Sequence, residues 1–506
     1  MFESKIRPAD DAIQVIQDGD VVYLGGNGAI NVPDFTIAAL ARRYENTGHP
    51  SDLTIVHTSG LGDQAGAGTD RLALSGMIKR VILGHYGMSP AIASLALSGD
   101  VEAYNFPQGV LSQLMRRVAG GHPGMLSRIG LGTFVDPRID GGKLNTATKE
   151  DLVKYVEMDG EEHLYYKIPP PDVAIVRGTT ADQLGNISLE HEAGWFEMLS
   201  QATAASNHGG SSIAQVARVV DARTIDPRQV KVPGHVIGAI VVDESQPQTL
   251  VEQFNPYYCG VERLQDPDYP DQELDQRLLI TRRAAQELEE GQMVNIGFGM
   301  SDGVPSAAED IGMMEKVTFT TEQGAWGGWP VTGVAFGAMS NPTAILDAPY
   351  QFDFYQGGGL DIAFLGMAQA DVEGNVNVSR FGRILAGCGG FIDITQSARK
   401  IVFCGTFGVK ANVEVTDGNV KVHDVGKAAK FVKKVEHITF SGKEALRRGQ
   451  QVLFISERAV FELTDDGIKL IELAPGVQLE KDVLGLMEFK PIVDDFDLMA
   501  TSLFLE

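Results

Sequence analysis

The strongest constraint on the fold of this 506-residue chain is an internal repeat. Asp18–Gly25, D-G-D-V-V-Y-L-G, is followed by Pro33. Glu290–Gly297, E-G-Q-M-V-N-I-G, has the same pattern and is followed by Pro305 at the same interval. A single match of this kind is weak evidence, but further matches follow in the same order, and ordered matches indicate a duplication.

The remaining matches extend the repeat through both halves of the chain. The pairs are Asp172–Val176 with Asp361–Leu365, Ala181–Ile187 with Ala370–Val376, and Gln215–Arg218 with Gln396–Arg399. The spacing between partners shrinks along the chain, so the first half carries extra residues, and Asn105–Lys167 is a candidate place for them. The repeat predicts two domains of similar fold.

Apolar, β-branched runs alternate with helical stretches in both halves. The runs are Val21–Leu24, Leu53–Val56, Val173–Val176, Val236–Val242, Met293–Ile296, Ile362–Leu365, Ile401–Phe403 and Val452–Ile455. The helical stretches include Phe35–Tyr44, Leu111–Val118 and Arg277–Glu289. Continuous apolar runs are typical of strands buried on both faces. We therefore predict an α/β protein with two duplicated, mainly parallel open sheets.

A Pro-rich, acidic and aperiodic segment separates the two halves. It has the composition of a linker, although its tyrosines suggest that it packs on a surface. We predict an N-terminal domain at residues 1–250, a linker at 251–275 and a C-terminal domain at 276–506.

The net charge of −25 and the pI near 4.8 argue against nucleic acid or an anionic membrane as partner, because phosphates would be repelled. The three cysteines, Cys259, Cys388 and Cys404, form no C-x-x-C pair, so neither zinc nor a disulfide framework is indicated. No apolar leader and no run long enough to span a bilayer is found. These features predict a cytoplasmic protein.

One acid stands alone in V-T-F-T-T-E-Q-G-A-W-G-G, the segment Val317–Gly328. A β-branched run ends at Glu322 and glycines follow, which predicts a strand opening into a tight turn. Ligands of open α/β sheets bind at such strand ends. The repeat places Thr58 at the equivalent position in the first half, so the fold itself does not require the acid. Glu322 is therefore a candidate nucleophile, against the alternative of a turn residue that satisfies local N–H groups.

Glycine clusters follow Glu322 at Gly357–Gly359 and at Gly387-Cys388-Gly389-Gly390. Glycine allows backbone N–H groups to approach a phosphate or an oxyanion, although a plain turn is the alternative. Five lysines between 421 and 434 form a dense basic group, and with Lys410 they could bind phosphate or could be a solvated face.

The sequence lacks the motifs of several common enzyme classes. Gly25-Gly26-Asn27-Gly28 follows a strand, but it is not the G-x-G-x-x-G of dinucleotide-binding folds, and no P-loop occurs. The histidines show no metal-binding spacing and no G-x-S-x-G is present, so a zinc enzyme and a Ser-His-Asp hydrolase are disfavoured.

The chain resembles the family I coenzyme A (CoA) transferases, in particular the single-chain acetate, propionate and 3-ketoacid type with fused α-type and β-type domains. The motifs that carry the resemblance cover nearly the whole chain. They are Tyr104–Gly109, Gly130–Pro137, Thr321–Gly324, Gly357–Asp361, Asp371–Asn377, Gly387–Asp393 and Ser456–Phe461.

The resemblance implies an active site between the two domains, with Glu322 as the catalytic glutamate and a covalent glutamyl-CoA thioester as intermediate. It implies that Gly387, Cys388, Gly389 and Gly390 belong to an oxyanion and CoA loop, and that Gln108 and Gly28 line the substrate pocket. Lys410 and Lys430 are weak candidates for the CoA phosphates. CoA would be a substrate, with no permanently bound cofactor and no metal. A homodimer or homotetramer is expected.

The resemblance is incomplete after the nucleophile, where Trp326 replaces a smaller aliphatic residue. Trp326 and Trp329 could wall the acyl pocket or could simply pack in a core. The sequence predicts an enzyme that moves CoA between a short-chain or 3-keto acyl-CoA and a free carboxylic acid. The alternatives are an acyl-CoA hydrolase on the same scaffold and a non-catalytic module that binds CoA or a sugar phosphate.

Overall fold

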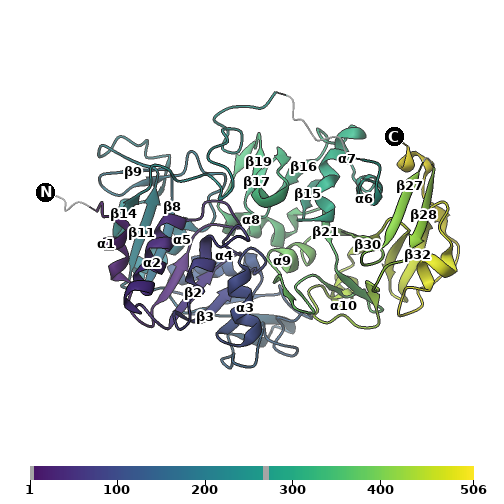
Figure 1. Ribbon diagram of the computed structural model, residues 1–506, viewed down its shortest axis with the longest axis horizontal. Helices are drawn as coiled ribbons and strands as arrows, with labels where there is room; N and C mark the ends of the chain where they lie inside the picture. Colours follow the sequence, from purple (N-terminus) through teal and green to yellow (C-terminus); the bar gives the residue numbers. More distant parts are fainter. Residues whose placement is uncertain (1–4, 266–272, 417, 506) are drawn as a thin grey trace. The chain divides into compact units, whose positions relative to one another are not determined.

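The computed structural model describes residues 5–265, 273–416 and 418–505 (Figure 1). The chain forms two compact units. Unit 1 comprises Met1–Leu264, Thr321–Asp353 and Leu385–Asp393, and unit 2 comprises Gln265–Thr320, Phe354–Ile384 and Ile394–Glu506. The units are therefore not contiguous in sequence, unlike the predicted domains 1–250 and 276–506. Part of the predicted linker 251–275, residues 266–272, lies outside the described residues.

Unit 1 is built on a seven-stranded sheet in the order β14-β11-β8-β1-β2-β3-β4, in which every neighbouring pair is parallel. Its strands are β1 (Val21–Leu24), β2 (Leu53–His57), β3 (Ile78–Leu83), β4 (Glu102–Asn105), β8 (Val173–Arg177), β11 (Ser211–Val216) and β14 (Ala239–Val242). The continuous apolar runs predicted a sheet covered on both faces, and both faces of this sheet are buried.

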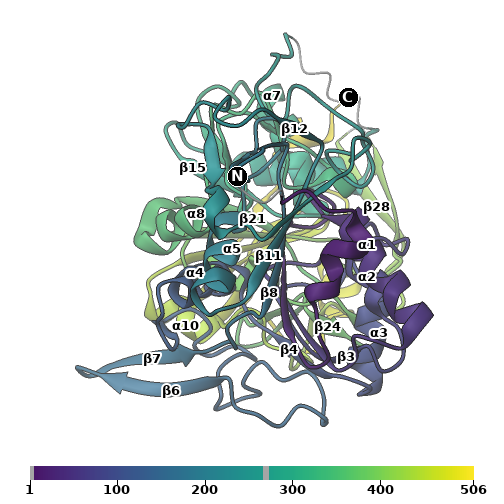
Figure 2. The same ribbon diagram turned by 90° about the vertical axis from the view of Figure 1, so that its left-hand side faces the viewer.

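Helices cover the two faces of this sheet separately. The helices that pack on the sheet are α1 (Ala9–Ala12), α2 (Asp34–Thr47), α3 (Pro90–Ser98), α4 (Gln108–Ala119) and α5 (Met198–Asn207). Figure 2 shows α4 and α5 on one side of the strands and α1, α2 and α3 on the other. Alternate residues of β1 point to opposite faces, so Tyr23 packs with α4 and α5 while Val22 and Leu24 pack with α2.

Smaller sheets complete unit 1. One has the order β12-β9-β10-β13, formed by β12 (Arg218–Val220), β9 (Thr180–Asp182), β10 (Ile187–Ser188) and β13 (Val230–Val232). Short antiparallel pairs are formed by β17 (Ala325–Trp326) with β20 (Ala344–Ile345) and by β18 (Trp329–Pro330) with β19 (Met339–Ser340). Helix α8 (Ala348–Phe354) follows β20.

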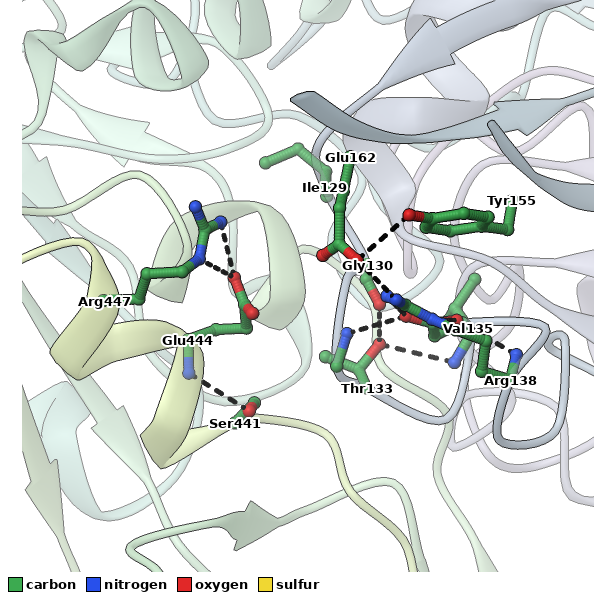
Figure 3. A network of polar contacts seen from close by, with 12 residues as sticks. Ile129, Gly130, Thr133, Val135, Arg138, Tyr155, Glu162, Ser441, Glu444 and Arg447 are labelled. Carbon is green, nitrogen blue, oxygen red and sulfur yellow. Dashed lines mark hydrogen bonds and ion pairs between the residues drawn. The ribbon is translucent and has the colours of Figure 1, made fainter. Parts of the chain in front are cut away.

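The extra residues of the first half include a three-stranded antiparallel sheet in the order β5-β7-β6, formed by β5 (Met125–Ser127), β6 (Val153–Met158) and β7 (Glu161–Tyr166). The β6–β7 hairpin projects from unit 1 (Figure 2). Arg138 donates to Glu162 of this hairpin at 2.6 Å and lies over the ring of Tyr155, whose hydroxyl also donates to Glu162 (Figure 3).

The main sheet of unit 2 has the strand order β16-β15-β21-β26-β30-β31-β32-β33. Its strands are β15 (Met293–Ile296), β16 (Thr318–Thr320), β21 (Ile362–Gly366), β26 (Lys400–Cys404), β30 (Gln451–Ile455), β31 (Ala459–Thr464), β32 (Gly467–Leu473) and β33 (Asp497–Leu498). The first five are parallel, and β31 and β32 continue the sheet as antiparallel strands.

Short helices and smaller strands complete unit 2. They are α6 (Gln276–Ala285), α7 (Val304–Asp310), α10 (Gly442–Arg447), β22 (Gln369–Asp371), β23 (Val376–Asn377), β27 (Asn412–Thr416), β28 (Asn419–Asp424) and β29 (Phe431–Val432). Ser441 caps the start of α10 by accepting from the backbone N–H of Glu444, whose carboxylate pairs with Arg447 (Figure 3). Among the described residues, no helix is both long and apolar enough to cross a membrane.

The strand orders confirm the duplicated α/β fold. In unit 1 the order β2-β1-β8-β11-β14 corresponds strand for strand to β16-β15-β21-β26-β30 in unit 2. In the smaller sheets, β9 and β10 likewise correspond to β22 and β23, and both pairs are antiparallel. The repeated segments of the sequence therefore form the same framework twice.

Strand register shows that Thr58 and Glu322 occupy equivalent positions. Val21 pairs with Thr54 in unit 1, and Met293, its counterpart in the repeat, pairs with Thr318. Counting four residues onward from Thr54 and Thr318 reaches Thr58 and Glu322. The acid therefore follows the strand that corresponds to β2, as the repeat predicted.

A fully buried carboxyl group lies beside Thr58. Glu197, which immediately precedes α5, accepts from Ser112 Oγ at 2.5 Å and from Thr58 Oγ1 at 3.1 Å. Burial raises the pKa of Glu197 to about 7, although both hydrogen bonds oppose the shift. The carboxyl group therefore keeps its proton over a range in which an ordinary glutamate is ionised.

The raised pKa predicts that stability falls as the pH rises. Between pH 4.5 and about 7 the unfolded chain releases a proton that folded Glu197 retains, so ionisation favours unfolding by up to about 3 kcal/mol. We expect Glu197→Gln to reduce this decline, measured by urea unfolding between pH 4.5 and 8. Glu45→Gln, at an exposed position of α2, is the control. An unchanged pH dependence in Glu197→Gln would contradict the assignment.

Candidate active site

The candidate residues gather at the carboxyl ends of four adjacent parallel strands of unit 1. Asn27 and Gly28 follow β1, Thr58 follows β2, His85 follows β3 and Gln108 follows β4. This edge is where open α/β sheets bind ligands, because backbone groups and loop side chains converge there. The segments containing Glu322 and the Gly387–Gly390 loop also belong to unit 1, and they contact these strand ends.

A tight turn presents Glu322. The Thr321 backbone N–H donates to the Ala325 carbonyl and the Gly324 N–H donates to the Thr321 carbonyl, both at 3.0 Å. Gly324 has a φ of +106°, and a Cβ there would lie 2.2 Å from the Leu346 carbonyl oxygen, so only glycine fits. The glycine two residues after the acid is therefore required by the turn that positions the acid.

Neutral amides link Glu322 to the loop after β1. Gln323 Nε2 lies 3.3 Å from Glu322 Oε1 and 3.3 Å from Asn27 Oδ1, so the carboxamide bridges the two side chains. Glu322 is 9% exposed, and Asn27 and Gln323 are buried. Neither amide was predicted from the sequence as a site residue, although Asn27 is adjacent to Gly28 and Gln323 is adjacent to Glu322.

Unit 1 anchors the Gly387–Gly390 loop through its backbone. The Cys388 N–H donates to Asn105 Oδ1 at 2.9 Å, and the Gly389 N–H donates to the Gly84 carbonyl at 2.7 Å. These two amides are occupied by the protein. Within the described residues, the N–H groups of Gly387 and Gly390 have no hydrogen-bond acceptor, so they are the donors that the loop can offer to a ligand.

Gly389 leaves a small space between two polar side chains. A Cβ at residue 389 would lie 3.6 Å from His85 Cδ2 and 3.9 Å from Gln108 Oε1, which are ordinary van der Waals distances. We call this space, bordered by Gly389, His85 and Gln108, the Gly389 notch. Gln108 is fixed from its backbone, since its N–H donates to the Gly389 carbonyl at 2.9 Å.

Buried polar atoms without protein partners accumulate near this edge of the sheet. Gln108 Nε2, Asn27 Nδ2, Gln323 Oε1 and both ring nitrogens of His57 have none among the described residues. Leaving such groups unpaired costs free energy, so a cluster of them indicates that a polar ligand or water completes the site. Gly28, half-buried at the same edge, leaves open space where a side chain would lie.

The two tryptophans after Glu322 lie on short strands. Trp326, on β17, is half-buried and its Nε1 donates to Gln351 Oε1 of α8. Trp329, on β18, is also half-buried. A partly exposed ring held by a side-chain hydrogen bond is compatible with a pocket wall, and the assignment of both residues to the acyl pocket remains a prediction.

The two lysines proposed for the CoA phosphates belong to unit 2. Lys430 Nζ donates to Thr406 Oγ1 at 2.9 Å, and burial lowers the pKa of this amine. Lys410 is exposed and has a backbone φ of +55°. Lys430 thus has a role inside unit 2, and phosphate binding by either residue stays a prediction.

The chemistry available here is that of a buried carboxylate, Glu322, that accepts a hydrogen bond from the neutral carboxamide of Gln323. No cluster of three metal-ligating side chains is found in the described parts of the chain. Burial raises the pKa of the Cys388 thiol well above its usual value, so this cysteine is not a thiolate nucleophile. Glu322 therefore remains the candidate nucleophile, and this role stays a prediction.

Known proteins with similar sequences agree with this interpretation. The family model described as coenzyme A transferase matches residues 6–243. The acetate CoA-transferase YdiF of Escherichia coli (strain K12) is 43% identical over 99% of this chain and 95% of its own length. The caffeate CoA-transferase of Acetobacterium woodii is 41% identical over 99% of this chain and 98% of its own.

A solved structure shows the same fold over almost the full length. The acyl-CoA transferase YdiF of E. coli O157:H7, in a thioester complex with CoA, superposes with a TM-score of 0.93 at 41% identity, covering 99% of this chain and 96% of that chain. Full-length similarity at this level, together with the duplicated sheets, establishes the relationship. The chain therefore belongs to the coenzyme A transferase family and is an enzyme that transfers CoA.

Proposed function

We propose that this enzyme moves CoA from a short-chain acyl-CoA to a free carboxylic acid through a covalent thioester on Glu322. The observation that carries the proposal is the position of Glu322, which is held on a tight turn, accepts from the carboxamide of Gln323 and is replaced by threonine in the duplicated half. The thioester complex of the similar YdiF structure supports a covalent route.

The proposed reaction balances without an external acid or base. The Glu322 carboxylate attacks the thioester carbonyl, and the C–S bond breaks. CoA departs as the thiolate, and the acyl group stays on the enzyme as a mixed anhydride with Glu322. The thiolate then attacks the glutamyl carbonyl and releases the acyl group as a carboxylate. The enzyme now holds a glutamyl-CoA thioester, and an acceptor carboxylate reverses the two steps.

Each attack creates a tetrahedral oxyanion that needs fixed donors. Gln108 Nε2 is a buried donor without a protein partner, and the N–H groups of Gly387 and Gly390 have no acceptor among the described residues. We propose that Gln108 and one of these amides bind the oxyanion. Such donors stabilise a transition state by several kcal/mol because they are oriented before the charge develops.

The substrate class is a small carboxylic acid and its CoA thioester. YdiF is named for acetate and the Acetobacterium woodii relative for caffeate, so the scaffold accommodates acids of different size. We propose that Trp326 and Trp329 form one wall of the acyl pocket and so limit the size of the acyl group. We also propose that the enzyme is a homodimer or a homotetramer. Analytical ultracentrifugation measures this oligomeric state.

We expect a CoA adduct on Glu322 when the enzyme is incubated with acyl-CoA and no acceptor. The peptide containing Glu322 should gain the mass of CoA less one water, measured by mass spectrometry. Glu322→Gln should show no adduct and lose CoA transfer by about 10³-fold or more, because an amide is a poor nucleophile. Full activity in Glu322→Gln would refute the mechanism, whereas acyl-CoA consumption without an adduct would favour a hydrolase.

Filling the Gly389 notch should block chemistry without unfolding the protein. An alanine methyl at residue 389 fits sterically, at 3.6 Å from His85 and 3.9 Å from Gln108. It would occupy the space proposed for a substrate oxygen, so we expect Gly389→Ala to lower kcat/KM by about 10²-fold, the scale of a lost oxyanion donor.

Gly160→Ala is the matched control for backbone strain. Gly389 and Gly160 have φ of +51° and +79°, and a Cβ at Gly160 meets no atom within 4 Å. Both alanines should cost about 1–2 kcal/mol of stability from the positive φ, measured by thermal unfolding. Equal activity in the two variants would show that the notch is not part of the site.

A further inference from the structure

We propose that Gln323 is the hydrogen-bond donor for the oxyanion that forms on Glu322 itself. This inference rests on the proposed function and deepens it, because it gives a catalytic role to a residue that the proposed mechanism has not used. The evidence is the contact between Gln323 and the candidate nucleophile, the packing that holds the carboxamide, and the comparison with the duplicated half.

The proposed reaction creates oxyanions at two different carbon atoms. When Glu322 attacks an acyl-CoA, the charge develops on a substrate oxygen. When CoA thiolate or an acceptor carboxylate attacks the acylated enzyme, the carbon under attack is Cδ of Glu322. The electron pair of the glutamyl carbonyl then moves to a Glu322 oxygen, and a donor beside that oxygen stabilises the transition state.

Gln323 contacts an oxygen that can carry this charge. Its Nε2 lies 3.3 Å from Glu322 Oε1. Hydrogen bonds in catalytic sites are often long before substrate binds and shorten in the reacting complex. Oε1 is then the oxygen that stays on the glutamyl carbonyl, while the other oxygen bonds to the acyl group in the anhydride and leaves with it.

Neighbouring groups hold the Gln323 carboxamide in place. Asn27 Oδ1 accepts from the same Nε2 at 3.3 Å. A Cβ at Gly337 would lie 2.5 Å from Gln323 Cδ and 2.8 Å from Nε2, so the bare backbone of Gly337 packs directly on the carboxamide. The Gly337 carbonyl in turn accepts from Thr321 Oγ1 at 3.1 Å. The donor is therefore oriented before any charge develops.

Burial makes this hydrogen bond selective for the charged state. Gln323 is 4% exposed and Asn27 is 3% exposed, so water competes little for Nε2. The carbonyl oxygen of an anhydride or a thioester is a weak acceptor, whereas the tetrahedral oxyanion carries a full negative charge. The hydrogen bond therefore strengthens as the transition state forms, and this difference lowers the barrier.

The repeat separates the amide from the needs of the fold. Counting five residues from Thr54 and from Thr318, which have equivalent strand pairing, reaches Ser59 and Gln323. The next residue is glycine in both halves. The turn glycine is thus present with or without the acid, whereas the amide accompanies only the acid.

The test measures discharge of the glutamyl-CoA thioester by hydroxylamine after the acyl-CoA is removed. The hydroxylamine nitrogen attacks the glutamyl carbonyl and loses a proton to water, CoA thiolate leaves, and a hydroxamate remains on Glu322. Gln323→Met keeps the side-chain length but removes the donor. We expect it to slow discharge by about 10- to 100-fold, as for one hydrogen bond to a charged group. Mass spectrometry of the peptide containing Glu322 follows the reaction.

The carbonyl stretch of the thioester gives a second readout, which a merely structural role would not change. A hydrogen bond to the oxygen lowers the stretching frequency. We therefore expect the band of Gln323→Met at a higher frequency than that of the wild type, measured by infrared difference spectra with isotope-labelled glutamate. Gln229→Met, at an exposed position, is the control and should match the wild type in both measurements.

Gly337→Ala tests the same donor without changing Gln323. Its methyl group would displace the carboxamide, so discharge should again be slow. Gly333→Ala is the matched control, since Gly337 and Gly333 have φ of +104° and +74° and a Cβ at Gly333 meets no atom within 4 Å. Both alanines should lower thermal stability through the positive φ, and only Gly337→Ala should slow discharge.

The two proposals fail in different ways. A wild-type adduct, with wild-type discharge and an unshifted carbonyl band in Gln323→Met, would retain the covalent mechanism and reject Gln323 as the donor. Absence of the adduct in the wild-type enzyme would reject the covalent mechanism and, with it, the glutamyl carbonyl on which Gln323 acts. Should Gln323→Met not fold, equal discharge in Gly337→Ala and Gly333→Ala would reject the donor.

Discussion

The site depends on close contacts between backbone segments at the carboxyl end of the unit 1 sheet. Gly84 is the central case, since a Cβ there would lie 1.9 Å from the Thr58 carbonyl oxygen. Its own carbonyl accepts from the Gly389 N–H and from Asn105 Nδ2, both at 2.7 Å. Asn105 Oδ1 in turn accepts from the Cys388 N–H. One glycine and one buried amide thus fix the Gly387–Gly390 loop to strands β3 and β4.

The repeat and the apolar runs were sufficient to predict the framework. The predicted strands in both halves are present, because strands buried on two faces leave a continuous apolar signal. The run Val236–Val242 is shorter than predicted, since Val236 ends a 3-10 helix and β14 begins at Ala239. The predicted equivalence of Thr58 and Glu322 is confirmed by strand register. Strands β3 and β4 were not predicted, because I-K-R-V-I-L and E-A-Y-N are interrupted by charged residues that weaken the pattern.

The site was harder to predict than the fold, because its supporting residues are isolated in the sequence. Asn27, Gln323 and Asn105 are single polar residues at strand ends or turns, and their hydrogen bonds join segments that are distant in the sequence. The glycine loop shows the same limit. The sequence indicated its four amides together, whereas the structure shows two of them occupied within the protein.

The duplication explains why one half carries the chemistry. Both halves place a residue at the same strand end, but in the first half Thr58 donates to the buried carboxyl group of Glu197, whose pKa is raised to about 7 by burial. The equivalent acid, Glu322, accepts a hydrogen bond from the neutral carboxamide of Gln323. The proposed mechanism uses this difference between the halves, because attack on a carbonyl requires a carboxylate at the strand end, and threonine at the equivalent position does not supply one.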